Sequence, residues 1–146
     1  MKIPDLEKEG LVGRIPIDKK RVEQCMEIAR RDLETAQSLS DNNPDWAFSI
    51  AYNSMLQSAR ALMFSMGYRP LGQAQHISAV RFAEAVLGKK AKEVVMVMDR
   101  MRRKRHRVVY DTSGLISLGE ANRAVTNAEK FFRLTENELK KKKFIQ

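Results

Sequence analysis

Residues 44–67 of this chain read PDWAFSIAYNSMLQSARALMFSMG. The apolar residues of this stretch recur at the spacing of an α-helix, which gives one long, mostly apolar helical face. They are Trp46, Ala47, Ile50, Ala51, Met55, Ala59, Leu62, Met63 and Met66. Asn43 suits the N-cap, Pro44 suits the first helical position, and Gly67 suits the end of the helix. The stretch therefore predicts a long helix that packs against other helices.

Four further amphipathic segments flank this helix. They run from Asp18 to about residue 40, from His76 to Leu87, from about Lys90 to residue 110, and from Ser117 onward. Ser117 with Glu120 three residues later predicts a capping box at the start of the last segment. Because short connections join the five segments, the sequence predicts an all-α, antiparallel bundle of four long helices and one short helix.

The length of 146 residues and the 43% of apolar residues fit one domain over residues 1–146. Residues 1–17 contain two glycines and two prolines, so we expect them to lie over the bundle surface without a long helix. Residues 140–146 form a basic tail. The eight methionines are expected to fill the core.

Several classes of protein are excluded by simple counts. Cys25 is the single cysteine, and no Cys and His cluster has zinc-ligand spacing, so we expect a reducing compartment and neither a metal nor a cofactor. The N-terminus lacks the apolar core of a signal peptide, and no run approaches the ~20 apolar residues that span a bilayer. These features predict a cytoplasmic protein.

The net charge of +9 is concentrated in two places. Residues 99–107 read DRMRRKRHR, and residues 140–143 are four lysines. Outside these two runs the cations and anions balance. The condensed phosphate charge of a nucleic acid attracts clustered Lys and Arg, so the central run indicates either a polyanion-binding surface or a solvated helix face. The lysine run is more simply explained by cations at a helix C-terminus.

The helical period gives the direction in which each side chain of the central run points around the helix axis. At ~100° per residue, Arg105 falls about 40° from the centre of the apolar stripe at Met101, so we expect it to be partly buried and paired, with Asp99 or Asp111 as partner. Arg102, His106 and Tyr110 follow one another along the adjacent flank. Arginine forks bind phosphodiester oxygens, and a histidine can take a proton from a ribose 2′-hydroxyl without a metal. The alternative is a guanidinium that snorkels or pairs across a subunit interface.

The chain resembles one known family along nearly its whole length. The segments that carry the resemblance are LEKEGL at 6–11, DWAFSIAY at 45–52, ARAL at 59–62, GYRP at 67–70 followed by His76, and RRKRHRVVYD at 102–111. Their order and spacing resemble the HEPN domains, an all-helical group. The resemblance implies metal-independent endoribonuclease activity, often as a toxin paired with a nucleotidyltransferase antitoxin. It also implies a homodimer that brings two such helices together.

The active motif of that family is an arginine followed after four to six residues by a histidine, and two alignments fit. In the first, Arg105 is the motif arginine, His106 is the polar residue after it, and Tyr110 occupies the histidine position. In the second, Arg100 is the motif arginine and His106 the catalytic histidine. The first keeps more of the surrounding pattern and is preferred here. Tyrosine, with a reference pKa near ~10, is a poor general base at pH 7, so His106 is the substitute base.

These alignments give the candidate site. The candidate catalytic residues are Arg105, His106 and Tyr110, and the candidate nucleic-acid-binding residues are Arg100, Arg102, Arg103, Lys104 and Arg107. His76 is expected to pack or to form a hydrogen bond locally, and Tyr52 is expected to be a packed tyrosine whose hydroxyl has an interhelical partner. Neither is counted in the site.

The expected function is RNA binding, extended in the toxin type to metal-independent cleavage. The alternative is a non-catalytic module that binds a nucleotide or docks a nucleotidyltransferase partner. A third interpretation is a basic helical protein that contacts nucleic acid without chemistry.

Overall fold

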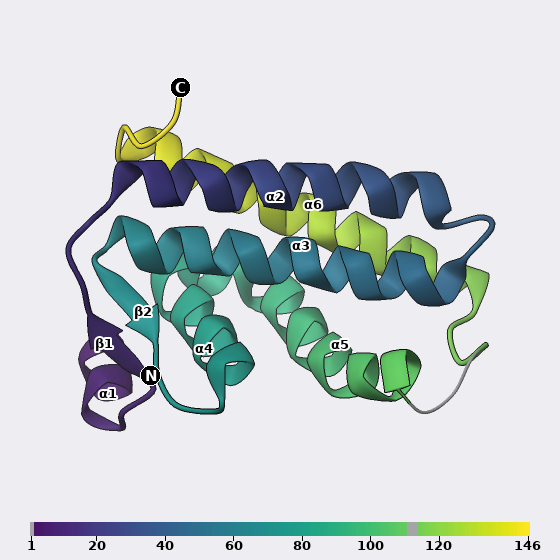
Figure 1. The fold of residues 1–146 in the computed structure, drawn as a ribbon, viewed down its shortest axis with the longest axis horizontal. Helices are drawn as coiled ribbons and strands as arrows, with labels where there is room; N and C mark the ends of the chain where they lie inside the picture. The colour runs from purple at the N-terminus through teal and green to yellow at the C-terminus, as the bar shows by residue number, and fades with distance from the viewer. Residues whose placement is uncertain (1, 111–113) are drawn as a thin grey trace.

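A computed structural model describes residues 2–110 and 114–146 (Figure 1). The elements in chain order are α1 Ile3–Lys8, β1 Val12–Arg14, α2 Lys19–Leu39, α3 Pro44–Ser65, β2 Tyr68–Pro70, α4 Gln75–Leu87, the 3-10 turn η1 Gly88–Ala91, α5 Lys92–Tyr110 and α6 Leu118–Lys141. The four long helices are α2, α3, α5 and α6, and α4 is shorter. The predicted all-α bundle is confirmed, and the structure adds α1 and a small two-stranded sheet.

Helix α3 lies at the centre of the bundle and is buried on nearly every side. It packs against α2, α6, α4 and α5. Figure 1 shows α2 along one side of α3, α6 behind it, and α4 and α5 on the opposite side from α2. A helix that is covered all round needs residues that other helices can approach, and α3 supplies buried Ala and Ser between larger apolar residues.

Small and polar side chains hold α2 against α3. The Ser54 hydroxyl on α3 donates a hydrogen bond to the Ala29 carbonyl of α2, with an Oγ to O distance of 2.7 Å. Next to it, the buried Asp32 carboxylate accepts a bond of 2.6 Å from the Asn53 amide. These bonds satisfy polar groups that would otherwise be costly to bury.

The helix caps agree only in part with the sequence prediction. Asp18 accepts hydrogen bonds from the backbone N–H groups of Lys20 and Arg21, as its N-cap position predicts. Asn43 precedes α3 but makes no side-chain cap bond. Ser117 caps α6 by accepting from the Glu120 N–H. The capping box also predicts a bond from the Glu120 carboxylate back to the Ser117 backbone N–H. That part of the prediction is wrong, because the Glu120 carboxylate binds Lys104 instead.

The N-terminal segment is more structured than predicted. It has no long helix, as expected, but Leu6 on α1 and Val12 on β1 are fully buried. β1 pairs with β2 in an antiparallel ladder, with Gly13 opposite Arg69. Gly67 connects α3 to β2 with a φ of +79°, and a Cβ there would come within 3.0 Å of the Ile15 carbonyl oxygen. The sequence predicts a loop at residues 68–75, but the first three of these residues form the strand β2.

The ends of the last two helices also differ from the prediction. α5 begins at Lys92, two residues later than predicted, because η1 occupies Gly88–Ala91. The sequence predicts that this helix ends at residues 111–114, and of these only Gly114 is among the described residues. At the C-terminus, the chain folds back after α6, where the Phe144 N–H donates to the Leu139 carbonyl and Phe144 and Ile145 pack partly buried against the core.

One carboxylate ties the start of α3 to the segment that leads into α6. Asp45 accepts hydrogen bonds from the backbone N–H of Gly114 at 2.6 Å and of Ile116 at 3.0 Å. Asp45 also lies in the first turn of α3, where the helix dipole favours a negative charge. This single side chain therefore holds residues 114–116, which lead into α6, against the central helix.

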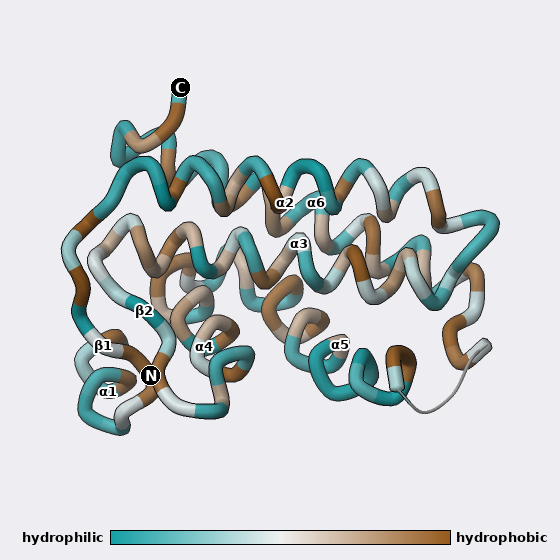
Figure 2. Tube along the Cα trace, viewed as in Figure 1, coloured by the Kyte–Doolittle hydropathy of each residue, from teal (hydrophilic) through white to brown (hydrophobic). Residues whose placement is uncertain are grey.

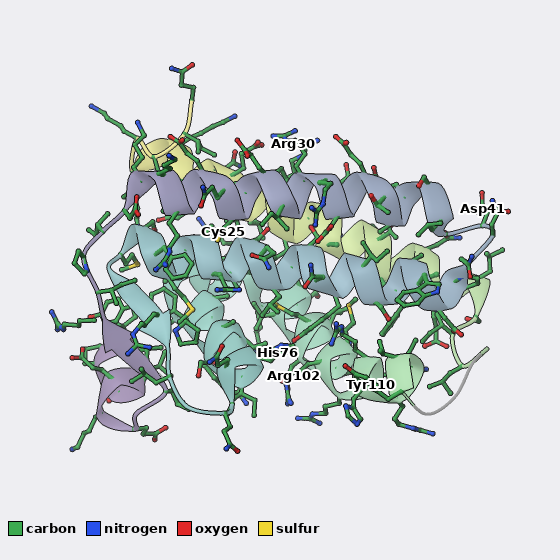
Figure 3. The ribbon with its side chains drawn as sticks, viewed as in Figure 1. Cys25, Arg30, Asp41, His76, Arg102 and Tyr110 are labelled. Atoms are coloured by element: carbon green, nitrogen blue, oxygen red, sulfur yellow. The ribbon has the colours of Figure 1, made fainter. Side chains whose placement is uncertain are left out.

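The substitution Asp45→Ala should lower the free energy of unfolding by about 1–3 kcal/mol, because two backbone donors lose a charged acceptor. Urea unfolding followed by circular dichroism measures the change. The matched control is Asp41→Ala, since Asp41 is exposed near the same end of the bundle and shows no side-chain hydrogen bond to a described residue (Figure 3). Asp41→Ala should change stability by no more than about 0.5 kcal/mol. Equal effects of the two substitutions would contradict the role given to Asp45.

Candidate functional site

The basic run lies on the second half of α5, which Figure 2 colours as hydrophilic up to the last turn. Three of its cations are held by carboxylates of the same chain. Asp99 binds Arg102 and Arg103, each with an N to O distance of 3.1 Å. Lys104 binds Glu120 at the start of α6 at 2.6 Å. Within the described residues, Arg100, Arg105 and Arg107 form no ion pair with a carboxylate.

A pocket of about 290 Å³ opens between the beginning of α4 and this part of α5. It is lined by Gln73, Ala74, His76, Ile77, Arg102, Arg105 and His106. Figure 3 shows His76 and Arg102 next to each other between the two helices. Three residues of the predicted site, Arg102, Arg105 and His106, thus line one pocket. His76, which the sequence analysis left out, lines the same pocket.

Arg105 is half-buried, as its angle on the helix predicts. Its Nε atom is buried and has no hydrogen-bond partner among the described residues. Asp99, one predicted partner, does not hold it, because Asp99 binds Arg102 and Arg103. Asp111, the other predicted partner, lies outside the described residues. The Arg105 guanidinium instead lies over the Tyr52 ring, with its carbon 5.6 Å from the ring centroid. A cation–π contact thus partly compensates for the lost water.

The Tyr52 ring connects Arg105 to His76. Tyr52 is fully buried on α3, and its hydroxyl oxygen lies 3.1 Å from Nδ1 of His76 on α4. The predicted interhelical partner of Tyr52 is therefore His76. Burial raises the pKa of the Tyr52 hydroxyl well above its usual range, while burial and the nearby Arg105, Arg102 and Arg60 lower the pKa of the His76 imidazole below its ordinary value. No sequence pattern reveals this pair, because the two residues are 24 positions apart on different helices.

His106 and Tyr110 lie on the surface beside this pocket. Both side chains are exposed, and their ring centroids are 5.0 Å apart. Their spacing of four residues places them on one side of α5, as predicted. Tyr110 is 70% exposed, which is unusual for a large aromatic side chain.

The structure separates the two residues of the second alignment. Arg100 lines a different pocket of about 360 Å³ between α5 and α6, with Lys104, Glu120 and Arg123. His106 lines the pocket between α5 and α4.

The described residues offer neither a cluster of metal ligands nor a membrane span. No group of three or more His, Cys, Asp or Glu side chains among them could hold a metal ion. None of the described helices has the length and apolar character needed to cross a membrane.

Comparisons with known proteins agree with the fold. A search of curated proteins gave no match. The chain is similar to the crystal structure of TT1696 from Thermus thermophilus, with a TM-score of 0.62 and 18% sequence identity over 82% of this chain and 98% of that chain. At that identity the likeness concerns the fold alone. The family model described as the HEPN domain matches residues 22–139, which include α3, α4 and α5. The chain therefore belongs to the HEPN domain family.

Proposed function

We propose that this protein binds RNA through the pocket between α4 and α5 and the basic side chains around it. Membership of the HEPN family supports a nucleotide- or RNA-related role in general. The observation that carries the narrower proposal is the pocket itself, where Arg102, Arg105 and two histidines come together. Such a group of donors suits the nonbridging oxygens of a phosphodiester.

The other cations extend this surface along the RNA backbone. Arg103 is 67% exposed on its side chain, so it can exchange Asp99 for a phosphate at little cost. Arg100, Lys104 and Arg107 contribute further charge on the same half of α5. Phosphate contacts of this kind give affinity without reading sequence, so we propose binding with little base specificity.

The catalytic part of the proposal is that the protein cleaves RNA without a metal ion, as a ribonuclease of the toxin type. His106 removes the proton of a ribose 2′-hydroxyl, and the 2′-oxygen then attacks the adjacent phosphorus. The bond from phosphorus to the 5′-oxygen breaks, and water protonates the leaving oxygen. The products are a 2′,3′-cyclic phosphate and a 5′-hydroxyl. Arg105 holds the phosphoryl oxygens, and Tyr110 beside His106 donates a hydrogen bond to the phosphate.

One observation favours a second candidate function, a non-catalytic module that binds a nucleotide or docks a nucleotidyltransferase. Tyr110 occupies the position of the family's catalytic histidine and is 70% exposed. Tyrosine is a weak base at neutral pH, and an exposed aromatic side chain is a common anchor in protein interfaces.

We also propose a homodimer in which two α5 helices face each other and join their pockets. The exposed side chains of Met96, 53%, and Tyr110, 70%, provide apolar contact area on this helix. Sedimentation equilibrium should give twice the chain mass of 16.8 kDa, and Met96→Lys should shift the equilibrium toward the monomer. A monomer at all concentrations tested would remove this part of the proposal.

RNA affinity should fall steeply with salt, because binding releases counterions from phosphates. The double substitution Arg102→Ala and Arg105→Ala should reduce the slope of log K against log salt by about 1–2 for single-stranded RNA. The control is Lys141→Ala with Lys143→Ala, two exposed lysines of the other basic run, which should leave the slope nearly unchanged. An unchanged slope in the α5 variant, with circular dichroism showing an intact fold, would place the RNA surface elsewhere.

If the protein cleaves RNA, cleavage should persist in EDTA and leave a 2′,3′-cyclic phosphate, because the proposed mechanism uses no metal and attacks through the 2′-oxygen. His106→Ala should abolish cleavage and leave most of the RNA binding, and Tyr110→Phe should have a smaller effect. Gel analysis of a labelled oligonucleotide with end-group mapping measures these outcomes.

Intact RNA after incubation would favour the non-catalytic module, in which case Tyr110→His should confer weak cleavage. Cleavage that needs a metal, or that survives His106→Ala, would contradict the mechanism.

A further inference from the structure

The buried Tyr52 hydroxyl and Nδ1 of His76 share a hydrogen bond whose direction depends on which nitrogen of the His76 ring carries the proton. This hydroxyl is fully buried on α3, and its one hydrogen-bond partner among the described residues is Nδ1 of His76, 3.1 Å away. A buried hydroxyl gives its proton to an acceptor when one is within reach. Tyr52 therefore donates, and Nδ1 of His76 accepts with its lone pair.

A histidine that accepts through Nδ1 is neutral and carries its proton on Nε2. The surroundings keep it neutral, because burial and the charges of Arg105, Arg102 and Arg60 lower the pKa of His76. Its place in the first turn of α4 acts in the same direction, since the positive end of a helix dipole disfavours a second positive charge. His76 thus offers a hydrogen-bond donor at Nε2 and no free base.

The Nε2 donor of His76 belongs to the pocket. The two nitrogens of an imidazole ring point in nearly opposite directions, so Nε2 faces away from Tyr52, and the ring lines the pocket with Arg102 and Arg105. Arg102 is already paired with Asp99. Arg105 has no described carboxylate partner, and its Nε is buried and unpaired. The pocket therefore combines a neutral donor with an uncompensated cation.

The first turn of α4 adds donors of the same kind. Ala74 is the N-cap residue and its side chain cannot accept, so the first backbone N–H groups of α4 have no side-chain cap. Ala74, His76 and Ile77 all line the pocket. With a volume of about 290 Å³, the pocket has room for a phosphate group and part of a sugar.

We propose that this pocket binds one phosphate group, that His76 donates its Nε2–H to a phosphate oxygen beside Arg105, and that Tyr52 is the positioning residue that fixes the His76 tautomer. The inference rests on the proposed function only for the source of the phosphate, which would be the RNA backbone. It also assigns different tasks to the two histidines, because His76 holds the phosphate while His106 meets the 2′-hydroxyl.

Nitrogen NMR of the labelled protein tests the tautomer directly. The chain has two histidines, so a His106→Gln variant leaves His76 as the only imidazole in the spectrum. At pH 7 we expect the pattern of a neutral ring protonated on Nε2, and Tyr52→Phe should convert it to a mixture of tautomers. A ring protonated on Nδ1, or on both nitrogens, would overturn the proposal.

Binding of inorganic phosphate and of adenosine 5′-monophosphate, measured by calorimetry at pH 7, tests the pocket. His76→Leu should weaken phosphate binding about tenfold, because a charged acceptor loses a hydrogen bond. His76→Gln places an amide N–H near the position of Nε2, so it should restore most of the affinity. Gln24→Ala, an exposed change on α2 outside the pocket lining, is the control and should have little effect.

The outcomes separate this inference from RNA binding. Phosphate binding that depends on His76, in a protein that does not bind RNA, would support the pocket and remove the proposed function. RNA binding with equal affinity in the wild type, His76→Leu and His76→Gln would leave the function and overturn the pocket. If His76→Leu does not fold, the comparison of His76→Gln with Tyr52→Phe and the tautomer spectrum still decide the question.

Discussion

Helix α3 is buried on nearly every side, and this burial limits how its four neighbouring helices can pack. A helix that touches four others cannot keep a polar face for water, so a polar residue on it is costly to bury unless it finds a partner inside the protein. Ser54 does so with a carbonyl of α2, Asn53 with Asp32, and Tyr52 with His76. Each of these bonds fixes the rotation of a neighbouring helix about its own axis, which apolar packing alone specifies less strictly.

The same constraint places the candidate site. Because α4 and α5 pack on α3 near Tyr52, its ring and hydroxyl are shared between them, with Arg105 over the ring and His76 at the hydroxyl. The pocket lies between the beginning of α4 and the second half of α5. Groups of the site are therefore held by regular helices and a buried tyrosine, which gives them more fixed positions than a loop would.

Local patterns in the sequence predicted the helices and the half-buried position of Arg105, because both depend on the helical period alone. The strands β1 and β2 are too short to show an alternation, and their pairing depends on Gly67 and on the packing of Leu6 and Val12. Glu120 could close a capping box or bind Lys104, and only the distance between α5 and α6 decides between them. The contact of His76 with Tyr52 is likewise a result of packing between distant segments, so the sequence showed the two residues without showing that they meet.

The distribution of charge on α5 gives the pocket a different character from an open basic surface. Asp99 and Glu120 hold three cations of the run, which reduces its long-range attraction and fixes the Arg102 guanidinium in place. Arg105 keeps its charge in a half-buried position where water cannot solvate it fully and the Tyr52 ring compensates only in part. An anion that enters the pocket interacts with this charge more strongly than with an exposed arginine, because less water screens the contact.

A ligand that binds the desolvated Arg105 guanidinium also stabilises the folded chain, since it binds the native arrangement of α3, α4 and α5 and not the unfolded chain. Occupancy of the pocket and stability of the bundle are thus thermodynamically linked through the same three helices.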